Sequence, residues 1–171
     1  LLLTFDDGTK DHIKYVTPIL KKKKISGIFF VPGRPVLEKK ALHAHAIHET
    51  LINTKDKGAI VKKIDNFYLR NGLIDKLKIF QKNNFCSDKF NNPTSRYIKK
   101  MLQIHLPIYE REKIISYFFH KNVTSNEADF VENFYLNEND LEYMQLNKMV
   151  LLPHSINHYH LTTLSKKELE K

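Results

Sequence analysis

The sequence has one cysteine, Cys86, no tryptophan, and no apolar stretch of the roughly 20 residues that a membrane-spanning helix requires. A single cysteine excludes an internal disulfide framework and slightly favours a reducing compartment such as the cytoplasm. The chain starts at Leu1, without an initiator Met and inside an expected strand, so a preceding signal peptide stays an open alternative. Oligomeric state is equally open.

Acidic residues are fewer than basic ones, 19 against 28, which gives a formal net charge of +9. The excess is mostly lysine scattered along the chain, with one tight run at Lys21–Lys24 and no second basic element with interleaved aromatics. We therefore interpret the charge as a compositional bias and expect no nucleic-acid partner. A basic nucleic-acid-binding domain is the alternative, and it predicts strongly salt-dependent binding.

The apolar run 1–5 has the pattern of a parallel strand buried on both faces, and the runs 27–31 and 149–152 predict two further strands. Helical spacing follows the first run, and the lysine run lies near the end of that helix, where cations suit the helix dipole. Before the third run, Asn137 is the expected N-cap of another helix, with Asp140 in its first turn and Asn147 as a left-handed end. The expected fold class is α/β.

The middle of the chain, from about 37 to 135, has helical patterns only. Its apolar stripes are Ile60, Val61, Ile64, Phe67 and Tyr68, then Tyr97, Ile98, Met101 and Leu102, and then Ile114, Ile115, Phe118 and Phe119. We interpret the aromatic run 117–119 as core rather than as a platform for sugar rings. We expect the segment 1–35 to be a first β/α part, 36–135 a helical insertion or subdomain, and 136–171 a continuation of the β/α part. Ser165 and Glu168 predict a capping box at the start of a last helix. The sequence "KKELEK" ends in the middle of this helical pattern, so we expect the chain to be a piece of a longer protein.

The first strand runs into "TFDDG", where two like charges, Asp6 and Asp7, stand side by side. One interpretation is a solvated turn, because Asp-Gly is a common turn dipeptide. The third strand runs into "PHSINH", which places His154 and His158 four apart. In a helical turn that spacing would put both imidazoles on one face, close enough to share one metal ion.

The two motifs are expected to lie at the same edge of the sheet. Parallel strands joined by right-handed crossovers open at one common edge with their C-terminal ends. Both motifs follow a strand end, so we expect two imidazoles and one carboxylate to meet there and leave open positions on an ion, as in catalytic zinc sites. A second possible cluster, His43, His45 and His48, is more simply explained as part of an amphipathic helix.

Together, "TFDDG" and "HSINH" resemble the first two motifs of the polysaccharide deacetylase (NodB-homology) family, carbohydrate esterase family four. The resemblance extends to "GIFFV" and "HLTTLSKKEL", and covers roughly 1–35 and 136–171. It implies part of a deformed (β/α) barrel, here with a large helical insertion between the second and third strands. It also implies a metal-dependent hydrolase that removes an acetyl group from an N-acetylated sugar of a polysaccharide or glycan precursor.

By the same resemblance, Asp7, His154 and His158 are the metal ligands, Asp6 is the catalytic base, and Ser155 is the hydroxyl that braces the histidine loop. The family's orienting arginine and general acid would follow Lys171. Zinc is the expected ion from the ligand types, and cobalt or nickel would also fit. The alternative is a non-catalytic carbohydrate-binding or assembly module on the same scaffold.

Overall fold

The computed structural model describes residues 2–169, which divide into two compact units. The first unit is Leu1–Leu42 with Asn126–His158, and the second is His43–Ser125 with Tyr159–Lys171. The domain boundaries expected at 35/36 and 135/136 stay a prediction. Within the described residues, no helix is both long and apolar enough to cross a membrane.

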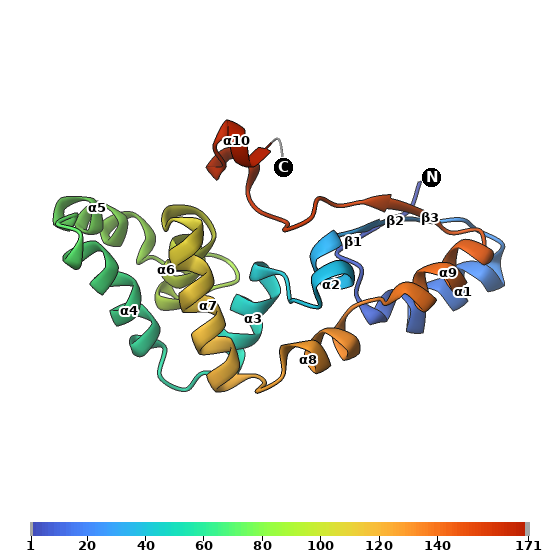
Figure 1. Cartoon of the computed structure of the whole chain (residues 1–171), viewed down its shortest axis with the longest axis horizontal. Helices are drawn as coiled ribbons and strands as arrows, with labels where there is room; N and C mark the ends of the chain where they lie inside the picture. Colours follow the sequence, from blue (N-terminus) through green and yellow to red (C-terminus); the bar gives the residue numbers. More distant parts are fainter. Residues whose placement is uncertain (1, 170–171) are drawn as a thin grey trace. The chain divides into compact units, whose positions relative to one another are not determined.

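The first unit is built on a three-stranded parallel sheet (Figure 1). Its strands β1 (Thr4–Asp6), β2 (Ile28–Val31) and β3 (Val150–Pro153) lie in that order, with β2 in the centre. The three predicted strands and their parallel direction are confirmed, with bounds that differ by one to three residues. Leu1, which the first prediction included, lies outside the described residues.

The expectation that the first strand is buried on both faces is wrong, because Thr4 and Asp6 of β1 are exposed. The same face of β3 is open as well, with Val150 and Leu152 45% and 40% exposed, whereas Phe29 on the opposite face is fully buried. The reason is that the core of this unit lies on one side of the sheet, where helices α1 (Thr17–Lys23) and α9 (Glu138–Leu146) cover it (Figure 1).

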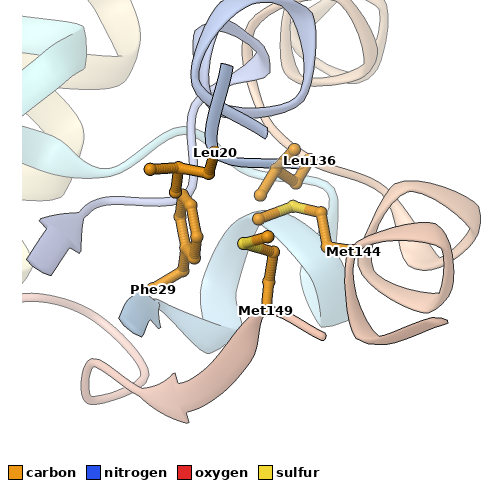
Figure 2. Close-up of a cluster of buried hydrophobic side chains, with 5 residues drawn as sticks. All are labelled: Leu20, Phe29, Leu136, Met144 and Met149. Carbon is orange, nitrogen blue, oxygen red and sulfur yellow. The ribbon is translucent and has the colours of Figure 1, made fainter. Parts of the chain in front are cut away.

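That core brings together side chains from distant parts of the chain (Figure 2). Its buried members are Leu20 of α1, Phe29 of β2, Leu136, Met144 of α9, and Met149. The contact between helix and strand is close, because a Cβ on the nearby Gly27 would lie 2.9 Å from a methyl carbon of Leu20. The segments before and after the helical middle of the chain therefore share one hydrophobic cluster.

The helix predicted after the first strand begins with a π-helical turn, η1 (His12–Val16), and continues as α1. The imidazole of His12 packs edge-on against the rings of Phe5 and Phe29, with ring centroids 5.9 Å and 5.4 Å away. Burial lowers the pKa of His12 below its ordinary value of 6.5, although Asp11, Asp7 and Asp6 act in the opposite direction.

Two further helices, α2 (Gly33–Glu38) and α8 (Glu127–Phe134), complete the first unit with α9. The predicted N-cap of α9 is confirmed: Asn137 and Asp140 each accept a hydrogen bond from the other's backbone N–H. The predicted left-handed end at Asn147 is wrong, since Asn147 has a φ of −95° and Lys148 has a φ of +65°. The reversal thus falls one residue later.

The second unit is helical throughout. Its elements are α3 (His43–Asn53), α4 (Lys57–Arg70), α5 (Ile74–Asn84), α6 (Pro93–Lys100), the π-helical turn η2 (Met101–His105), α7 (Ile108–Asn122), the 3₁₀ turn η3 (Leu161–Thr163) and α10 (Lys166–Leu169). The predicted apolar stripes are buried except for Val61 and Phe67 of α4, which are partly exposed. Of the predicted capping box of the last helix, the bond from the backbone N–H of Ser165 to the carboxylate of Glu168 is present, and Oγ of Ser165 donates to the same carboxylate. Residues 170 and 171 lie outside the described part.

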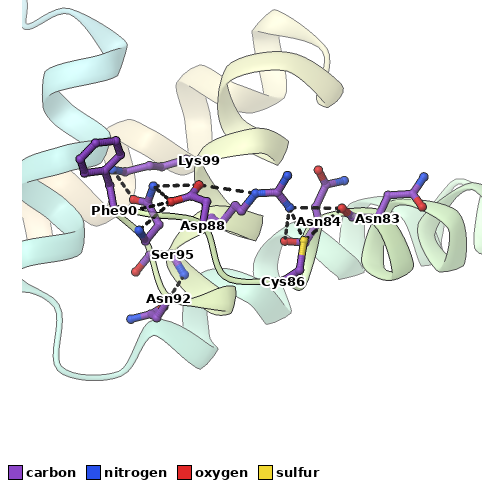
Figure 3. A network of polar contacts seen from close by, with 10 residues as sticks. Asn83, Asn84, Cys86, Asp88, Phe90, Asn92, Ser95 and Lys99 are labelled. Carbon is purple, nitrogen blue, oxygen red and sulfur yellow. Dashed lines mark hydrogen bonds and ion pairs between the residues drawn. The ribbon is translucent and has the colours of Figure 1, made fainter.

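A polar network holds the connection between α5 and α6 (Figure 3). Oδ1 of Asp88 accepts hydrogen bonds from the backbone N–H of Phe90 and of Asn91, and Asn92 caps α6 through the N–H of Ser95. These contacts lower the pKa of Asp88, the Phe90 bond most of all. The sequence "SDKFNNPTS" is thus an ordered turn that leads into a capped helix.

Replacing Phe29 with alanine should destabilise the first unit by about 3–5 kcal/mol, because the ring is fully buried and its loss leaves a cavity. The same change at Phe90, which is 84% exposed, is the matched control and should cost less than about 0.5 kcal/mol. Urea denaturation followed by circular dichroism measures both. Equal effects of the two changes would contradict the described core.

The partly buried His12 should make folding pH-dependent. Its folded pKa is lowered, so the unfolded chain binds the proton more tightly, and stability should fall as the pH drops below about 6.5. A His12→Leu variant should lose part of this slope in urea denaturations between neutral pH and about pH 5. His48→Leu, at an exposed position of α3, controls for loss of an imidazole. An unchanged slope in His12→Leu would refute the prediction.

Candidate metal centre

The "TFDDG" motif leaves β1 through a tight turn with unusual backbone conformation. Asp7 and Gly8 both have positive φ angles, +72° and +58°. A Cβ on Gly8 would lie 3.1 Å from Cγ1 of Val31, so the turn also approaches β2 closely. Glycine at this position satisfies both conditions, and the conformation of Asp7 is the strained one.

The same turn is held by the segment that leads into α9. Leu136 donates its backbone N–H to the carbonyl oxygen of Gly8 at 2.8 Å, and Thr9 forms an antiparallel bridge with Tyr135. The ammonium group of Lys10 then forms an ion pair with Asp140, the residue that also closes the capping box of α9. These contacts fix the turn at the C-terminal edge of the sheet.

The second motif is held by β2 as well. His154 donates its backbone N–H to the carbonyl oxygen of Val31 at 2.9 Å, so the ladder between β2 and β3 continues to the first histidine. The expectation of a helical turn over "HSINH" is wrong, since Ser155 and His158 have φ angles of +56° and +53° and the segment is an irregular loop. The two imidazoles nevertheless lie side by side, with ring centroids 4.8 Å apart.

Hydrogen bonds to the turn after β2 stabilise this loop. The N–H groups of Gly33 and Arg34 donate to the carbonyl oxygens of Ser155 and Ile156 at 3.0 and 2.9 Å. Within the loop, Oγ of Ser155 accepts the N–H of His158 at 3.0 Å. This is the contact that the expected bracing role of Ser155 requires.

Asp7, His154 and His158 come together in the structure. Oδ1 of Asp7, itself buried, lies 3.7 Å from Nε2 of His154 and 3.5 Å from Nε2 of His158. One ligand atom from each residue lies within 4.8 Å of the others, and this is the one such group of three or more found among residues 2–169. The three histidines of "HAHAIH" form no such group within the same described residues.

These distances fit a shared divalent ion. A hydrogen bond between such groups would measure about 2.7–3.2 Å. Two ligands at about 2.1 Å from one tetrahedral ion lie about 3.4 Å apart, close to the two values observed here. The donor set of two imidazoles and one carboxylate is one that zinc binds readily. Metal binding itself stays a prediction.

Asp6 ends β1 on a definite face of the sheet. It is the register partner of Phe30, which in turn pairs with Leu152, so the three side chains share one face. His154, two residues after Leu152, continues on the same face, and its ring lies 6.1 Å from that of Phe30. The exposed carboxylate of Asp6 and the first histidine therefore occupy the same edge and face.

Sequence reasoning missed two residues near the site. Arg34, nearly buried at 7% exposure, donates from Nη1 to Oδ1 of Asn157 at 3.4 Å and so reaches the histidine loop. Tyr135 is buried, and burial raises its pKa, with the charge of Asp7 acting in the same direction. Arg34 follows the end of the second strand, so the strand-end argument could have found it; nothing in the sequence marked Tyr135.

Comparison with known proteins bears on the first of the two motifs. Residues 1–63 match the family model described as polysaccharide deacetylase. The match extends beyond the resemblance expected over 1–35, into α4, and leaves out the histidine loop, where the resemblance stays a prediction. Neither the curated proteins nor the solved structures give a match to this chain. The match over residues 1–63 is to the family predicted from the motifs, and it confirms that resemblance for this part of the chain.

Proposed function

We propose that the chain carries the metal site of a hydrolase that removes an acetyl group from an N-acetylated sugar of a polysaccharide or glycan precursor. The observation that carries the proposal is the convergence of Asp7, His154 and His158, beside Asp6, at the edge where the parallel strands end. The family match over residues 1–63 supports deacetylation as the class of reaction. The proposed scaffold is part of a deformed (β/α) barrel with a helical insertion between β2 and β3.

The proposed ion is zinc, held by Oδ1 of Asp7 and the Nε2 atoms of His154 and His158. Three protein ligands leave a coordination position open, which distinguishes catalytic from structural zinc sites. When bound, a divalent ion supplies Lewis-acid chemistry, withdrawing electron density from an acetyl carbonyl and favouring ionisation of a nearby water.

The residues of the chain divide the remaining tasks. A carboxylate oxygen of Asp6 accepts the proton of the water that attacks the acetyl carbon. Asp7 contributes negative charge to the ion, and the hydrogen bonds from Gly33 and Arg34 keep the histidine loop in position before substrate arrives. The nitrogen then takes up one proton, equal in number to the one that Asp6 has accepted, and the carbon–nitrogen bond breaks to release acetate and the sugar amine.

Asp7→Asn, His154→Gln and His158→Gln, each alone, should weaken zinc binding by about a hundredfold or more, because losing even an outer partner of a ligand costs ten- to a hundredfold. Isothermal titration calorimetry of zinc into the metal-free chain measures this. Binding should also weaken in acid, since ligation needs neutral imidazoles. His48→Gln is the control. Unchanged binding in all three variants would exclude this site.

Asp6→Asn should lower acetate release from an N-acetylated chito-oligosaccharide by about 10²- to 10⁴-fold while leaving zinc affinity unchanged, because the amide cannot accept the proton. Asp11→Asn, at an exposed position of the same segment, is the matched control. Full activity of Asp6→Asn would rule out its role as base. Zinc binding without any acetate release by the wild type would favour the non-catalytic carbohydrate-binding module.

A further inference from the structure

The charge of the protein is distributed unevenly between its two units. Of the 28 basic and 19 acidic residues, 18 basic and 9 acidic residues lie in the second unit, which therefore carries the entire formal charge of +9. The first unit, with the remaining 10 of each sign, is formally neutral. The excess of positive charge, which is spread along the linear sequence, therefore belongs to the helical unit. That unit attracts anions.

Within this unit, helices α4 and α7 form a groove of about 490 Å³. On α4 its lining includes Lys63, Phe67 and Arg70, which share one helix face by their spacing. On α7 it includes Tyr109, Lys113 and Tyr117, spaced four apart. We call this set the α4–α7 groove. Phe67, which the sequence assigns to the apolar stripe of α4, is partly exposed and lines this groove.

The aromatic rings of the groove are exposed rather than packed inside. Tyr109 and Tyr117 are 57% and 54% exposed, while their helix neighbours Phe118 and Phe119 are buried. The sequence interpretation of 117–119 as core is therefore wrong for Tyr117. The ring of Tyr109 also contacts Phe67 across the groove, with centroids 6.5 Å apart, which joins the two helices at this point.

Cations gather over these rings. The ammonium group of Lys63 lies 5.8 Å and that of Lys121 5.9 Å from the ring centroid of Tyr117, and Lys113 lies 5.4 Å from that of Tyr109. Glu110 is the carboxylate of the lining, and it faces Lys113 at 4.0 Å. Several positive charges are thus held close together, and a bound anion would relieve their mutual repulsion.

We propose that the α4–α7 groove binds an acidic glycan chain, with Lys63, Arg70 and Lys113 contacting its carboxylates. Lysine and arginine bind such groups by charge-assisted hydrogen bonds, and the amide side chains of Asn66 and Asn71 line the same groove within reach of sugar hydroxyls. Single-stranded nucleic acid is less well suited, because its bases stack on ring faces and here an ammonium group already lies over each tyrosine ring, at 5.8 Å for Tyr117 and 5.4 Å for Tyr109, and competes for that face. The choice of a glycan rests on the proposed function; the attraction of the groove for anions does not.

The test is calorimetric titration of the full chain with a short oligogalacturonate, a sugar polymer with one carboxylate on each ring. The neutral methyl ester of the same polymer and an oligothymidylate of matched charge are titrated in parallel. The variant is Lys63→Gln/Arg70→Gln/Lys113→Gln. Its control, Lys21→Gln/Lys22→Gln/Lys23→Gln in α1, removes the same charge from the tight lysine run.

The groove variant should bind oligogalacturonate about tenfold more weakly than the wild type, and the control less than about twofold more weakly. The neutral ester should bind weakly to every protein. Equal losses in the two variants, or equal binding of the ester, would overturn the proposal. Tighter binding of oligothymidylate that the groove variant loses would assign the groove to nucleic acid.

Asp7→Asn separates this proposal from the proposed function. The variant should bind oligogalacturonate as the wild type does, because Asp7 belongs to the other unit and the groove does not use it. If Asp7→Asn still binds oligogalacturonate, and neither zinc binding nor acetate release is found, the groove assignment would hold although the proposed function had failed. Loss of oligogalacturonate binding in Asp7→Asn would place the contact at the metal site instead and refute the groove.

Discussion

The pairing of β2 with both other strands is the constraint on which the site depends. β2 aligns Asp6 with Phe30 and Phe30 with Leu152, so two segments separated by roughly 145 residues end at one edge. Closing such a long connection costs only a few kcal/mol of chain entropy, because that cost grows with the logarithm of length. The shared core of Phe29, Met144 and Met149 can offset it. A large helical segment between two strands is therefore compatible with a precise site at their ends.

Backbone strain is concentrated where the candidate ligands lie. Among residues 2–169, six residues other than glycine have positive φ angles, and three of them, Lys24, Lys39 and Lys148, follow helix ends, where that conformation is common. The other three are Asp7, Ser155 and His158. Such conformations persist only where the surroundings fix them. For Ser155 and His158 the turn after β2 does so through the N–H groups of Gly33 and Arg34. For Asp7 the segment before α9 does so, through the bond from Leu136 to Gly8. The ligand positions are thus set by backbone contacts with residues outside both motifs.

The sequence predicted the parts of this arrangement that follow from strand order. Apolar runs located the strands, the rule that parallel strands open at one edge joined "TFDDG" with "PHSINH", and Asn137 with Asp140 located α9. The spacing of His154 and His158 suggested a helical turn, which is wrong. Two imidazoles four residues apart can also lie side by side in a loop that contains two left-handed residues. Arg34 was missed because periodicity reports which side chains are apolar and not which loops exchange hydrogen bonds.

The basic groove shows a second limit of reasoning from the linear sequence. Net charge and lysine runs are properties of the linear sequence, and by that measure Lys21–Lys24 was the most basic element. The groove instead draws its cations from α4 and α7, whose lysines and arginine are single residues along the chain. Helix packing brings them together, and exposed tyrosines hold their ammonium groups at 5.4–5.9 Å. A basic surface of this kind is found only when the charges of each compact unit and of each helix face are counted separately. The residues of one unit or one helix face are not consecutive in the sequence, so the linear order does not show them together.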